Sequence, residues 1–453
     1  MTWFHRQTAR WLALPLVAAL VAGCDTDLLQ VTDPDVVTPE QAAGPGAVPL
    51  RLAGMVRDFQ EAVDNVTRYE GLFTDEMILS GTFPTRIDVD ERNVVTDPDN
   101  GTLNGDVFLP LQISRSSADR NRDEFREALT DPEFEEVLAD VEEGLALANL
   151  YGGYIRLYMA ELYCAVIDEP KGAPISPDAA AEIAISRFEE AEQVAGDAGL
   201  TGIEQAAIVG QARALLWLEE YQAAAAEAAR VDPGFVFVAE YSDNQNVQAN
   251  EYYAFTWAAA GQQARWTVGD GTAANRHNER FAYYDEWVAQ GLLLPSPDGI
   301  NAPEVGVEIT LQLLYDNGNR PILVSSWWEA RMIEAEAELR AGNAGAAEQI
   351  VNELLADPTL NPMLEVNPDL EGVLGAFDPV DFTGSLQTDL PQLARARLAG
   401  LWLTGTRQAT LRRFVENDNI DLYPQGTQGD DIFFPIPQQE IDNNPNLSSG
   451  CPL

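Results

Sequence analysis

The feature of this sequence that most restricts its fold is the three- and four-residue spacing of apolar side chains between residues 142 and 164. Apolar side chains at this spacing lie on one face of an α-helix, whereas a half-buried strand requires strict alternation. The positions that carry the pattern are Leu147, Leu150, Tyr154, Leu157, Tyr158 and Leu162. The pattern predicts an amphipathic helix, and helices are expected to dominate the rest of the chain.

Later stretches have the pattern of paired helices. Ala184, Phe188 and Ala191 match the A-x3-F-x2-A pattern of the second helix of a tetratricopeptide repeat, whose small residues let helices approach closely. A second pair is predicted with Tyr221 at its turn, and a third over residues 327–358. The sequence therefore predicts an all-α fold, a tetratricopeptide-repeat-like helical scaffold with long loop insertions.

Residues 1–23 have the form of a lipoprotein signal peptide. A positively charged start precedes an apolar run from Trp11 to Ala22, which is too short to cross about 30 Å of hydrocarbon as a helix. The sequence Val-Ala-Gly before Cys24 resembles the bacterial lipobox, so we expect cleavage before Cys24 and lipid on its sulfur. Residues 24–49 are then an acidic, proline-containing tether. A plain secretory signal or a buried N-terminal helix is the alternative.

The remaining residues, 50–453, are expected to form one helical domain. Its N-terminal part spans about 50–235 and its C-terminal part about 236–453. Residues 51–79 are predicted to be helical. The glycine, proline and aspartate residues of the segment 81–110 predict turns, and no helix is expected there.

Composition narrows the possible functions. The formal net charge of −46 disfavours nucleic acid and anionic lipid surfaces as partners, because both are negatively charged. Without the signal peptide, His277 is the remaining histidine, so a multi-histidine zinc site is excluded and a serine or cysteine hydrolase would depend on this residue. We expect His277 in a solvated loop. No catalytic residue, metal ligand or cofactor is assigned.

Oxygen-bearing side chains between residues 97 and 106 suggest a calcium loop as one interpretation. They are Asp97, Asp99, Asn100, Asn104 and Asp106. Their spacing lacks the glycine and the final glutamate of the helix-loop-helix calcium pattern. We therefore expect an acidic loop.

With Cys24 lipidated, the chain retains an even pair of cysteines, Cys164 and Cys451. An even pair in an oxidising compartment is typical of a disulfide, which here would tie the C-terminal tail to the helical body. Two separate buried thiols are the alternative. We expect the bridge.

Two stretches that interrupt the helical pattern are the candidate ligand-binding segments. Residues 251–287 concentrate aromatic side chains among Gln, Asn and Arg, a composition suited to stacking on sugar rings and holding hydroxyls. Residues 80–88 add one ring and one guanidinium group. The candidate ligand-binding residues are Phe83, Arg86, Tyr253, Trp257, Trp266 and Trp287. We expect the two segments to converge on one exposed face, although a place in the core is the alternative for each ring.

The C-terminal tail carries the most specific motif. The sequence "RLAGLWLTGTRQATLRRF" is followed by "YPQGTQGDDIFFPIPQQEIDNNPNL". The matching residues are Gly405, Arg407, Leu411-Arg412-Arg413, Pro435-Ile436-Pro437, Glu440 and Asn444-Pro445-Asn446. This pattern resembles the end of the SusD/RagB family of nutrient-binding outer-membrane lipoproteins. The lipobox and the acidic tether agree with the resemblance.

The resemblance implies a SusD-like body whose four tetratricopeptide-like helix pairs pack against a SusC-like, TonB-dependent outer-membrane barrel. It implies a non-enzymatic protein, lipid-anchored in the outer membrane and facing the cell exterior, that captures a glycan or another oligomeric nutrient and delivers it to the barrel. From the residues alone, a tetratricopeptide scaffold that binds only protein and a surface glycoside hydrolase with two carboxylates remain as alternatives.

Overall fold

In the computed structural model the described residues are 44–95, 99–244, 248–257, 266–268, 281–295, 310–425 and 427–451. The predicted signal peptide, Cys24, Asp97 and His277 lie outside these residues. The helical body is one compact unit, Val48–Leu453. Among the described residues, no helix combines the length and apolar character that crossing a bilayer requires.

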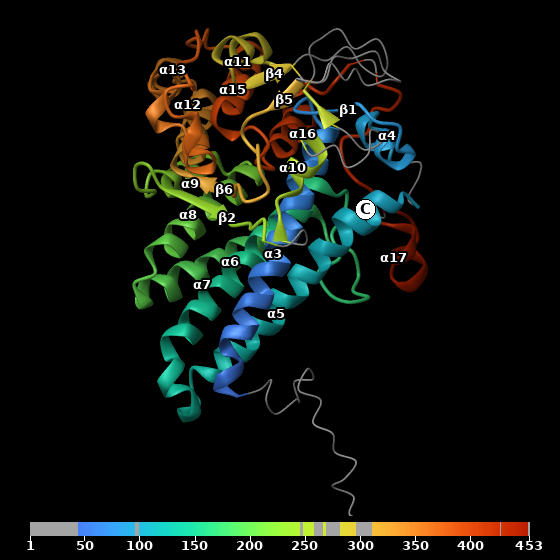
Figure 1. Cartoon of the computed structure of the whole chain (residues 1–453), viewed down its shortest axis with the longest axis vertical. Coiled ribbons are helices and arrows are strands. Elements are labelled where there is room, and N and C mark those ends of the chain that lie inside the picture. The colour runs from blue at the N-terminus through green and yellow to red at the C-terminus, as the bar shows by residue number, and fades with distance from the viewer. Residues whose placement is uncertain are drawn as a thin grey trace, which may run out of the picture. The chain divides into compact units, whose positions relative to one another are not determined.

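Helices form most of the compact unit (Figure 1). They are α3 (Val48–Phe73), α4 (Pro84–Asp90), α5 (Leu109–Ala128), α6 (Leu138–Leu162), α7 (Pro177–Ala198), α8 (Thr201–Trp217), α9 (Tyr221–Ala228), α10 (Glu251–Thr256), α11 (Tyr284–Gln290), α12 (Trp327–Arg340), α13 (Ala344–Ala356), α14 (Met363–Val366), α15 (Leu386–Leu401), α16 (Arg407–Asp418) and α17 (Gln438–Asn443). A π-helical segment, Leu103–Phe108, runs directly into α5. Short 3-10 helices are Pro45–Ala47, Pro132–Val137, Pro358–Leu360 and Pro368–Leu370.

The strands are short and pair only two at a time in the described residues. They are β1 (Ile78–Leu79), β2 (Val236–Ala239), β3 (Trp266–Thr267), β4 (Leu293–Pro295), β5 (Thr310–Gln312) and β6 (Ile322–Ser326). The antiparallel pairs are β1 with β3, β2 with β6, and β4 with β5. The predicted all-α class is therefore confirmed, with strands serving only to fasten loops.

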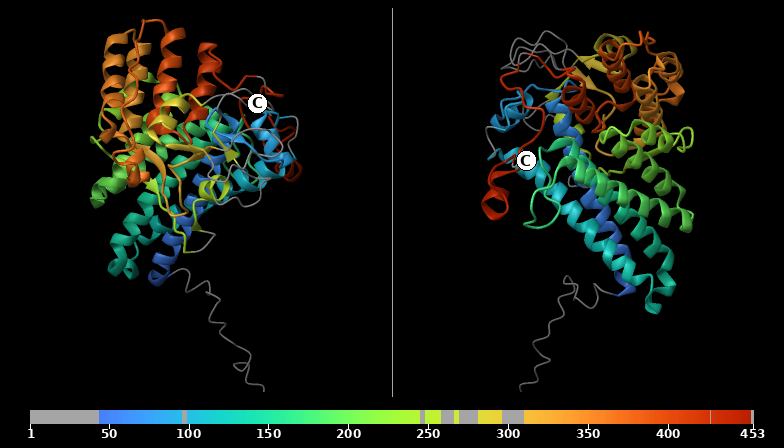
Figure 2. Two further views of the ribbon diagram at one scale, coloured as in Figure 1. Left: turned by 45° about the horizontal axis from the view of Figure 1, so that its top comes forward. Right: turned by 180° about the vertical axis from the view of Figure 1, so that it is seen from behind.

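Helix α6 is the centre of the bundle, and α3, α5, α7 and α8 pack against it (Figures 1 and 2). The prediction of an amphipathic helix was wrong in one respect, because α6 is buried on all sides from Gly144 to Leu162. Polar residues on its surface are therefore buried as well, and they require partners.

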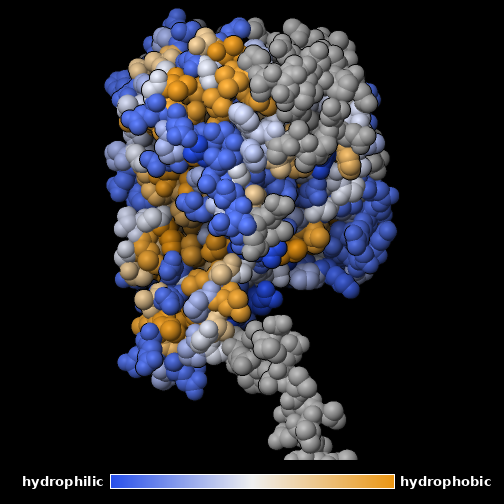
Figure 3. Space-filling model, viewed as in Figure 1, coloured by the Kyte–Doolittle hydropathy of each residue, from blue (hydrophilic) through white to orange (hydrophobic). Residues whose placement is uncertain are grey.

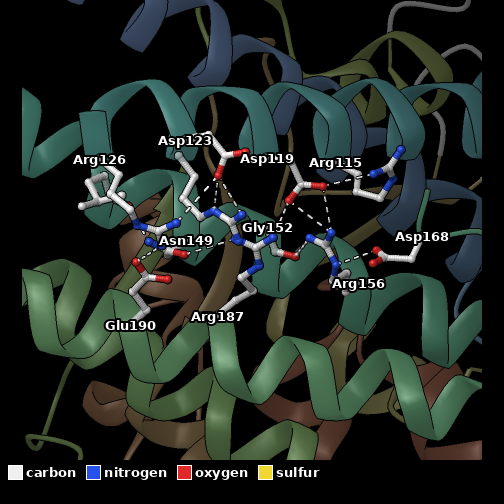
Figure 4. A network of polar contacts seen from close by, with 12 residues as sticks. Arg115, Asp119, Asp123, Arg126, Asn149, Gly152, Arg156, Asp168, Arg187 and Glu190 are labelled. Atoms are coloured by element: carbon white, nitrogen blue, oxygen red, sulfur yellow. Dashed lines mark hydrogen bonds and ion pairs between the residues drawn. The ribbon is translucent and has the colours of Figure 1, made fainter. Parts of the chain in front are cut away.

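One such set of partners joins α5, α6 and α7 (Figure 4). Asp119 of α5 lies 2.8 Å from the guanidinium of Arg156 on α6 and 2.7 Å from that of Arg187 on α7. Arg115, one turn before Asp119, lies 3.1 Å from the same carboxylate. Asp119 thus links arginines from three helices, and Asp168, 2.7 Å from Arg156, supplies a second carboxylate to the same network.

The predicted helix pairs are confirmed. α8 and α9 flank the predicted turn, which ends at Tyr221, and α12 and α13 flank the predicted third turn. Phe188 of α7 lies between Gly153 of α6 and Gly210 of α8. A Cβ atom at either glycine would come within 2.6 Å of its ring. The aromatic residue of the repeat pattern therefore fills a space that only glycine leaves open.

The arginines of the C-terminal motif join helices that are distant in sequence. Arg407 forms two 2.7 Å hydrogen bonds to Asp75. Arg412 donates to the last carbonyl groups of α6, and Arg413 holds Glu336 of α12 at 2.7 and 3.0 Å. Three arginines surround Glu336, which lowers its pKa to about 2 despite its burial.

The tail is held by the predicted bridge. Cys164, just after α6, is disulfide-bonded to Cys451, with 5.6 Å between their Cα atoms. A separate apolar cluster lies beneath the tail and comprises Ala165, Ile167, Ile436, Ile441 and Leu447. The prediction of the bridge is confirmed, and the Pro-Ile-Pro motif contributes Ile436 to this cluster.

The prediction that residues 81–110 lack helix was wrong. Pro84 occupies the first turn of α4, where its missing N–H costs nothing. Asn100 caps the π-helical segment, because its side-chain oxygen accepts hydrogen bonds from the amides of Thr102 and Leu103. Proline and asparagine act here as helix initiators rather than as turn residues.

Candidate functional site

A cleft of about 750 Å³ lies between α3, the π-helical segment and the stretches 240–242 and 248–251. We call it the groove. Its lining residues are Leu50, Ala53, Gly54, Arg57, Gln60, Glu61, Asp64, Asn65, Gly105, Asp106, Pro110, Glu240, Tyr241, Ser242, Gln248, Ala249 and Glu251. A volume in this range matches that of small-molecule and oligomer sites in proteins.

Local structure fixes the walls of the groove. The phenol of Tyr241 donates to the carbonyl of Gln60 at 2.6 Å and so holds the 240–242 loop against α3. Asn250 caps α10 by accepting from the amide of Tyr252, and it donates to the carbonyl of Arg320 at 3.0 Å. The groove is therefore built on one rigid helix and two fastened loops.

A stack of alternating rings and guanidinium groups borders the groove beside Asp106. The guanidinium of Arg86 lies 4.9 Å from the ring centre of Phe83 and 4.5 Å from that of Phe255 in α10. Its Nη2 is also 3.9 Å from the carboxylate of Asp106, which lines the groove. Phe83 is 43% exposed and forms the outer end of the stack.

The inner end of the stack reaches α3. The guanidinium of Arg68 lies 4.7 Å from the ring of Phe255, and Phe255 stacks on Trp266 with 5.2 Å between ring centres. Tyr69 packs edge-on against Trp266 and donates its hydroxyl to Asp106 at 2.5 Å. The outer ring is therefore positioned through a continuous chain of contacts to the core.

The charges at this end of the groove are paired. Arg68 is almost fully buried, and its guanidinium lies 2.5 Å from Glu251 and 3.3 Å from Asp64. Burial raises the pKa of Asp64 to about 7, against the opposing effect of Arg68. The two carboxylates raise the pKa of Arg68, so its guanidinium remains charged.

The structure brings together two of the predicted ligand-binding residues and places the others elsewhere. Phe83 and Arg86 lie together beside the groove, as described above. Tyr253 is half-buried in α10. Trp257 is half-buried too, and its indole N–H donates to the carbonyl of Gln312 at 2.6 Å.

Trp266 and Trp287 do not fit the predicted role on an exposed face. Trp266 is 0% exposed and Trp287 is 1% exposed, so neither ring can stack on a ligand. Trp287 packs edge-on against Trp402, with 4.7 Å between ring centres. Their burial has an ordinary cause, since large rings contribute most to stability when they are fully removed from water.

The two segments nevertheless approach each other. Strand β1 pairs with β3, with Leu79 opposite Trp266, and this places the 80–88 loop beside the aromatic segment. The ring that completes the contact is Phe255, which sequence reasoning did not select. Its position two residues after Tyr253 and two before Trp257 was the available signal, but only tertiary contacts distinguish the three.

The acidic residues that line the groove were also missed. Glu61 and Asp64 belong to a predicted helix, and nothing local marks them as facing a cleft. Asn100 and Asp106, from the calcium interpretation, serve other partners, namely the cap of the π-helical segment and Tyr69. Within the described residues, no group of three or more His, Cys, Asp or Glu side chains is arranged to hold a metal ion.

The surface offers no single large apolar area on the face shown in Figure 3, where hydrophobic residues form separate patches among hydrophilic ones. The exposed large apolar side chains of the described residues include Leu50 at the groove and Phe83 beside it. Their position next to the cleft favours a ligand with apolar faces and polar edges.

No protein-family model matches the chain, and no curated protein sequence matches it. Solved structures do. A SusD superfamily protein from Bacteroides vulgatus aligns with a TM-score of 0.61 at 11% identity, over 90% of this chain and 98% of the other. A SusD-like carbohydrate binding protein from the same species aligns with a TM-score of 0.60 at 14% identity, over 91% and 98%.

A SusD/RagB family protein from Bacteroides thetaiotaomicron gives a TM-score of 0.61 at 14% identity, over 88% of this chain and 94% of the other. At these identities the likeness concerns the arrangement of the backbone. It confirms, at the level of the fold, the resemblance that the C-terminal motif indicated: the chain has the SusD-like fold.

Proposed function

We propose that this protein is a cell-surface lipoprotein that binds a glycan in the groove and delivers it to a TonB-dependent outer-membrane barrel of the SusC type. The observation that carries the proposal is the groove itself, bordered by the exposed ring of Phe83 on a stack anchored in the core. Support also comes from the SusD-like fold, since one neighbour is described as carbohydrate binding.

The ring of Phe83 and the groove offer complementary contacts to a sugar. An aromatic face packs on the apolar face of a pyranose, while amides such as those of Gln60, Asn65 and Gln248 can hold its hydroxyls. The proposed role is capture and delivery without bond cleavage. A protein that must pass its ligand to a transporter needs moderate affinity and rapid release.

Filling the groove tests this assignment. Gly54 lines the groove, and a Cβ atom there would meet nothing within 4 Å, so Gly54→Trp places a bulky ring in the cleft without disturbing the core. Gly345 in α13 is equally open and is the matched control. Calorimetry with a panel of neutral, amino and acidic oligosaccharides should find a ligand for the parent protein and for Gly345→Trp, and none for Gly54→Trp.

Two results would reject the assignment of the groove: no oligosaccharide binds the parent protein, or Gly54→Trp binds as the parent does. The same mixtures, analysed by mass spectrometry after prolonged incubation, test the absence of bond cleavage. Shortened oligosaccharides that depend on the protein would favour a surface glycoside hydrolase instead.

The proposals of a lipid anchor and of a barrel partner are based on the sequence. Cys24→Ser should release the protein from the outer-membrane fraction, because the acyl chains attached to Cys24 would be lost. Mild detergent extraction of native membranes should recover a TonB-dependent barrel with the parent protein. Retention of Cys24→Ser in cells that lack the barrel would place the anchor elsewhere.

A further inference from the structure

The proposed function leaves the class of glycan undefined, and the charges of the groove bear on it. Five of its lining residues carry carboxylates, and a single one, Arg57, carries a guanidinium. The acidic residues are Glu61, Asp64, Asp106, Glu240 and Glu251. They come from three separate segments of the chain, and so they surround the cleft rather than cluster on one turn.

Arginines next to the groove neutralise only part of the negative charge of its lining. Arg68 lies within ion-pair distance of both Asp64 and Glu251, and Arg86 lies 3.9 Å from Asp106. Among the described residues, these two arginines and Arg57 therefore face the five carboxylates of the groove. The exposed carboxylates of Glu61 and Glu240 remain accessible to a ligand that enters the groove.

The carboxylates that a ligand can reach are identifiable. The side chain of Glu61 is 52% exposed and has a loose contact of 3.7 Å with the exposed Arg57. Glu240 is exposed at the opposite wall. Deeper in the groove, Asp64 is only 4% exposed and is already held by Arg68 at 3.3 Å and by the amide of Glu251 at 3.2 Å. The carboxylates that a ligand can reach are therefore those of Glu61 and Glu240.

We propose that the groove selects a glycan with free amino groups, that is, an oligosaccharide containing glucosamine-type units, and rejects uronic-acid and sulfated glycans. This inference rests on the proposed function. An ammonium group is both a cation and a donor of three hydrogen bonds, so it suits the exposed carboxylates of Glu61 and Glu240. An anionic sugar would meet like charge in a partly desolvated cleft, which is an effective means of rejection.

Three β-1,4-linked hexasaccharides test the inference, because they share a backbone and differ in charge: cellohexaose is neutral, the glucosamine hexamer is cationic and the glucuronate hexamer is anionic. Exposed charge pairs each contribute only a few-fold in affinity, so two or more predict about tenfold tighter binding of the glucosamine hexamer than of cellohexaose. The difference should shrink in about 0.5 M salt, where screening is strong. The glucuronate hexamer should not bind.

Single substitutions test whether the preference for the glucosamine hexamer arises in the groove. Glu61→Gln and Glu240→Gln leave the pairs made by Arg68 and Arg86 intact, and each should weaken binding of the glucosamine hexamer about threefold. Arg57→Gln should strengthen it, a gain that misfolding cannot imitate. Glu136→Gln removes an exposed carboxylate that does not line the groove, and it controls for the net charge of −46.

Other results would reject charge selection, the role of the groove or the sugar assignment separately. Equal or tighter binding of the neutral or the anionic hexamer would overturn the charge selection while leaving glycan binding in place. If none of the three binds but another oligosaccharide of the panel does, charge selection is wrong and the proposed function stands. Equal effects of Glu136→Gln and Glu240→Gln would make the preference a property of the whole surface. Binding of hexalysine as tight as that of the glucosamine hexamer would favour a basic peptide and reject the sugar assignment.

Discussion

At the scale of single residues, exposure decides which aromatic side chains can serve a ligand. Phe83 and Trp266 belong to the same set of stacked rings, yet one is 43% exposed and the other is fully buried. Arg86 and Phe255 connect the outer ring to the inner one. The outer end of the stack is therefore accessible to a ligand, and the inner end belongs to the core.

The first prediction concerns Phe83, the outer ring of this stack. Phe83→Ala should weaken binding of the best oligosaccharide by about 1–3 kcal/mol, because it removes the exposed stacking face. Calorimetry measures the affinity. Leu138→Ala is the control, since Leu138 is similarly exposed, at 39%, and does not line the groove. Equal affinities for Phe83→Ala and the parent protein, with both folded, would place the stacking surface elsewhere.

A second residue-scale prediction concerns pH. Glu70 is buried in α3, where its Oε1 accepts a hydrogen bond from the amide of Gln408. Desolvation raises the pKa of Glu70 from 4.5 to about 8. Between these values the folded chain holds a proton that the unfolded chain has released. The free energy of unfolding should therefore fall as pH rises from about 4.5 to about 8.

Glu70→Gln isolates this contribution. The amide oxygen can still accept from Gln408, but it does not titrate, so the variant should show a smaller loss of stability over the same pH range. Urea denaturation at several pH values gives the slopes. Identical slopes for variant and parent would show that Glu70 is ionised in the folded protein. Glu136→Gln, at an exposed position, should leave the slope unchanged.

At the scale of secondary-structure elements, close approach of helices depends on glycine facing an aromatic ring. Phe188 of α7 fits against Gly153 of α6 and Gly210 of α8. Trp328 of α12 fits against Gly400 of α15 in the same way. These contacts set the distances between α6, α7 and α8 and between α12 and α15.

The third prediction follows from this packing. A Cβ atom at Gly210 would lie 2.5 Å from the ring of Phe188, so Gly210→Ala should destabilise the protein by about 1–3 kcal/mol. Gly202 in the same helix has nothing within 4 Å of its Cβ position. Gly202→Ala should therefore be neutral or slightly stabilising, since alanine favours helix. Thermal unfolding compares the two, and equal melting temperatures would contradict the packing argument.

In the molecule as a whole, contacts between residues distant in sequence hold the helical body together. Arg407 joins the C-terminal motif to Asp75, and the bridge joins Cys451 to Cys164 across 287 residues. The C-terminal motif therefore holds distant segments together, and its residues do not line the groove.

The fourth prediction concerns the bridge. Replacing both cysteines, Cys164→Ser with Cys451→Ser, should lower the free energy of unfolding by about 2–5 kcal/mol, because the unfolded chain loses a long closed loop. Urea denaturation measures the change. Reductant should destabilise the parent protein and leave the double variant unaffected. Alkylation of two thiols in an unreduced, denatured fragment lacking Cys24 would contradict the bridge.

From the sequence we could predict the helix pair with its turn at Tyr221, the helix pair over residues 327–358, the bridge between Cys164 and Cys451 and, through the C-terminal motif, the fold. These features depend on short-range periodicity, on the number of cysteines or on a contiguous motif, all of which are local properties of a chain.

Three features could be recognised only from tertiary contacts. They are the exposure of each ring, the partners of Arg412 and Arg413, and the position of the groove. Trp266 and Trp287 are as aromatic as Phe83, and no local pattern separates them. Burial depends on what packs against a side chain, and here the neighbours come from segments more than a hundred residues away, as with Trp287 and Trp402. A groove likewise depends on how separate segments pack, so its acidic lining is recognisable only once α3 lies beside residues 240–242 and 248–251.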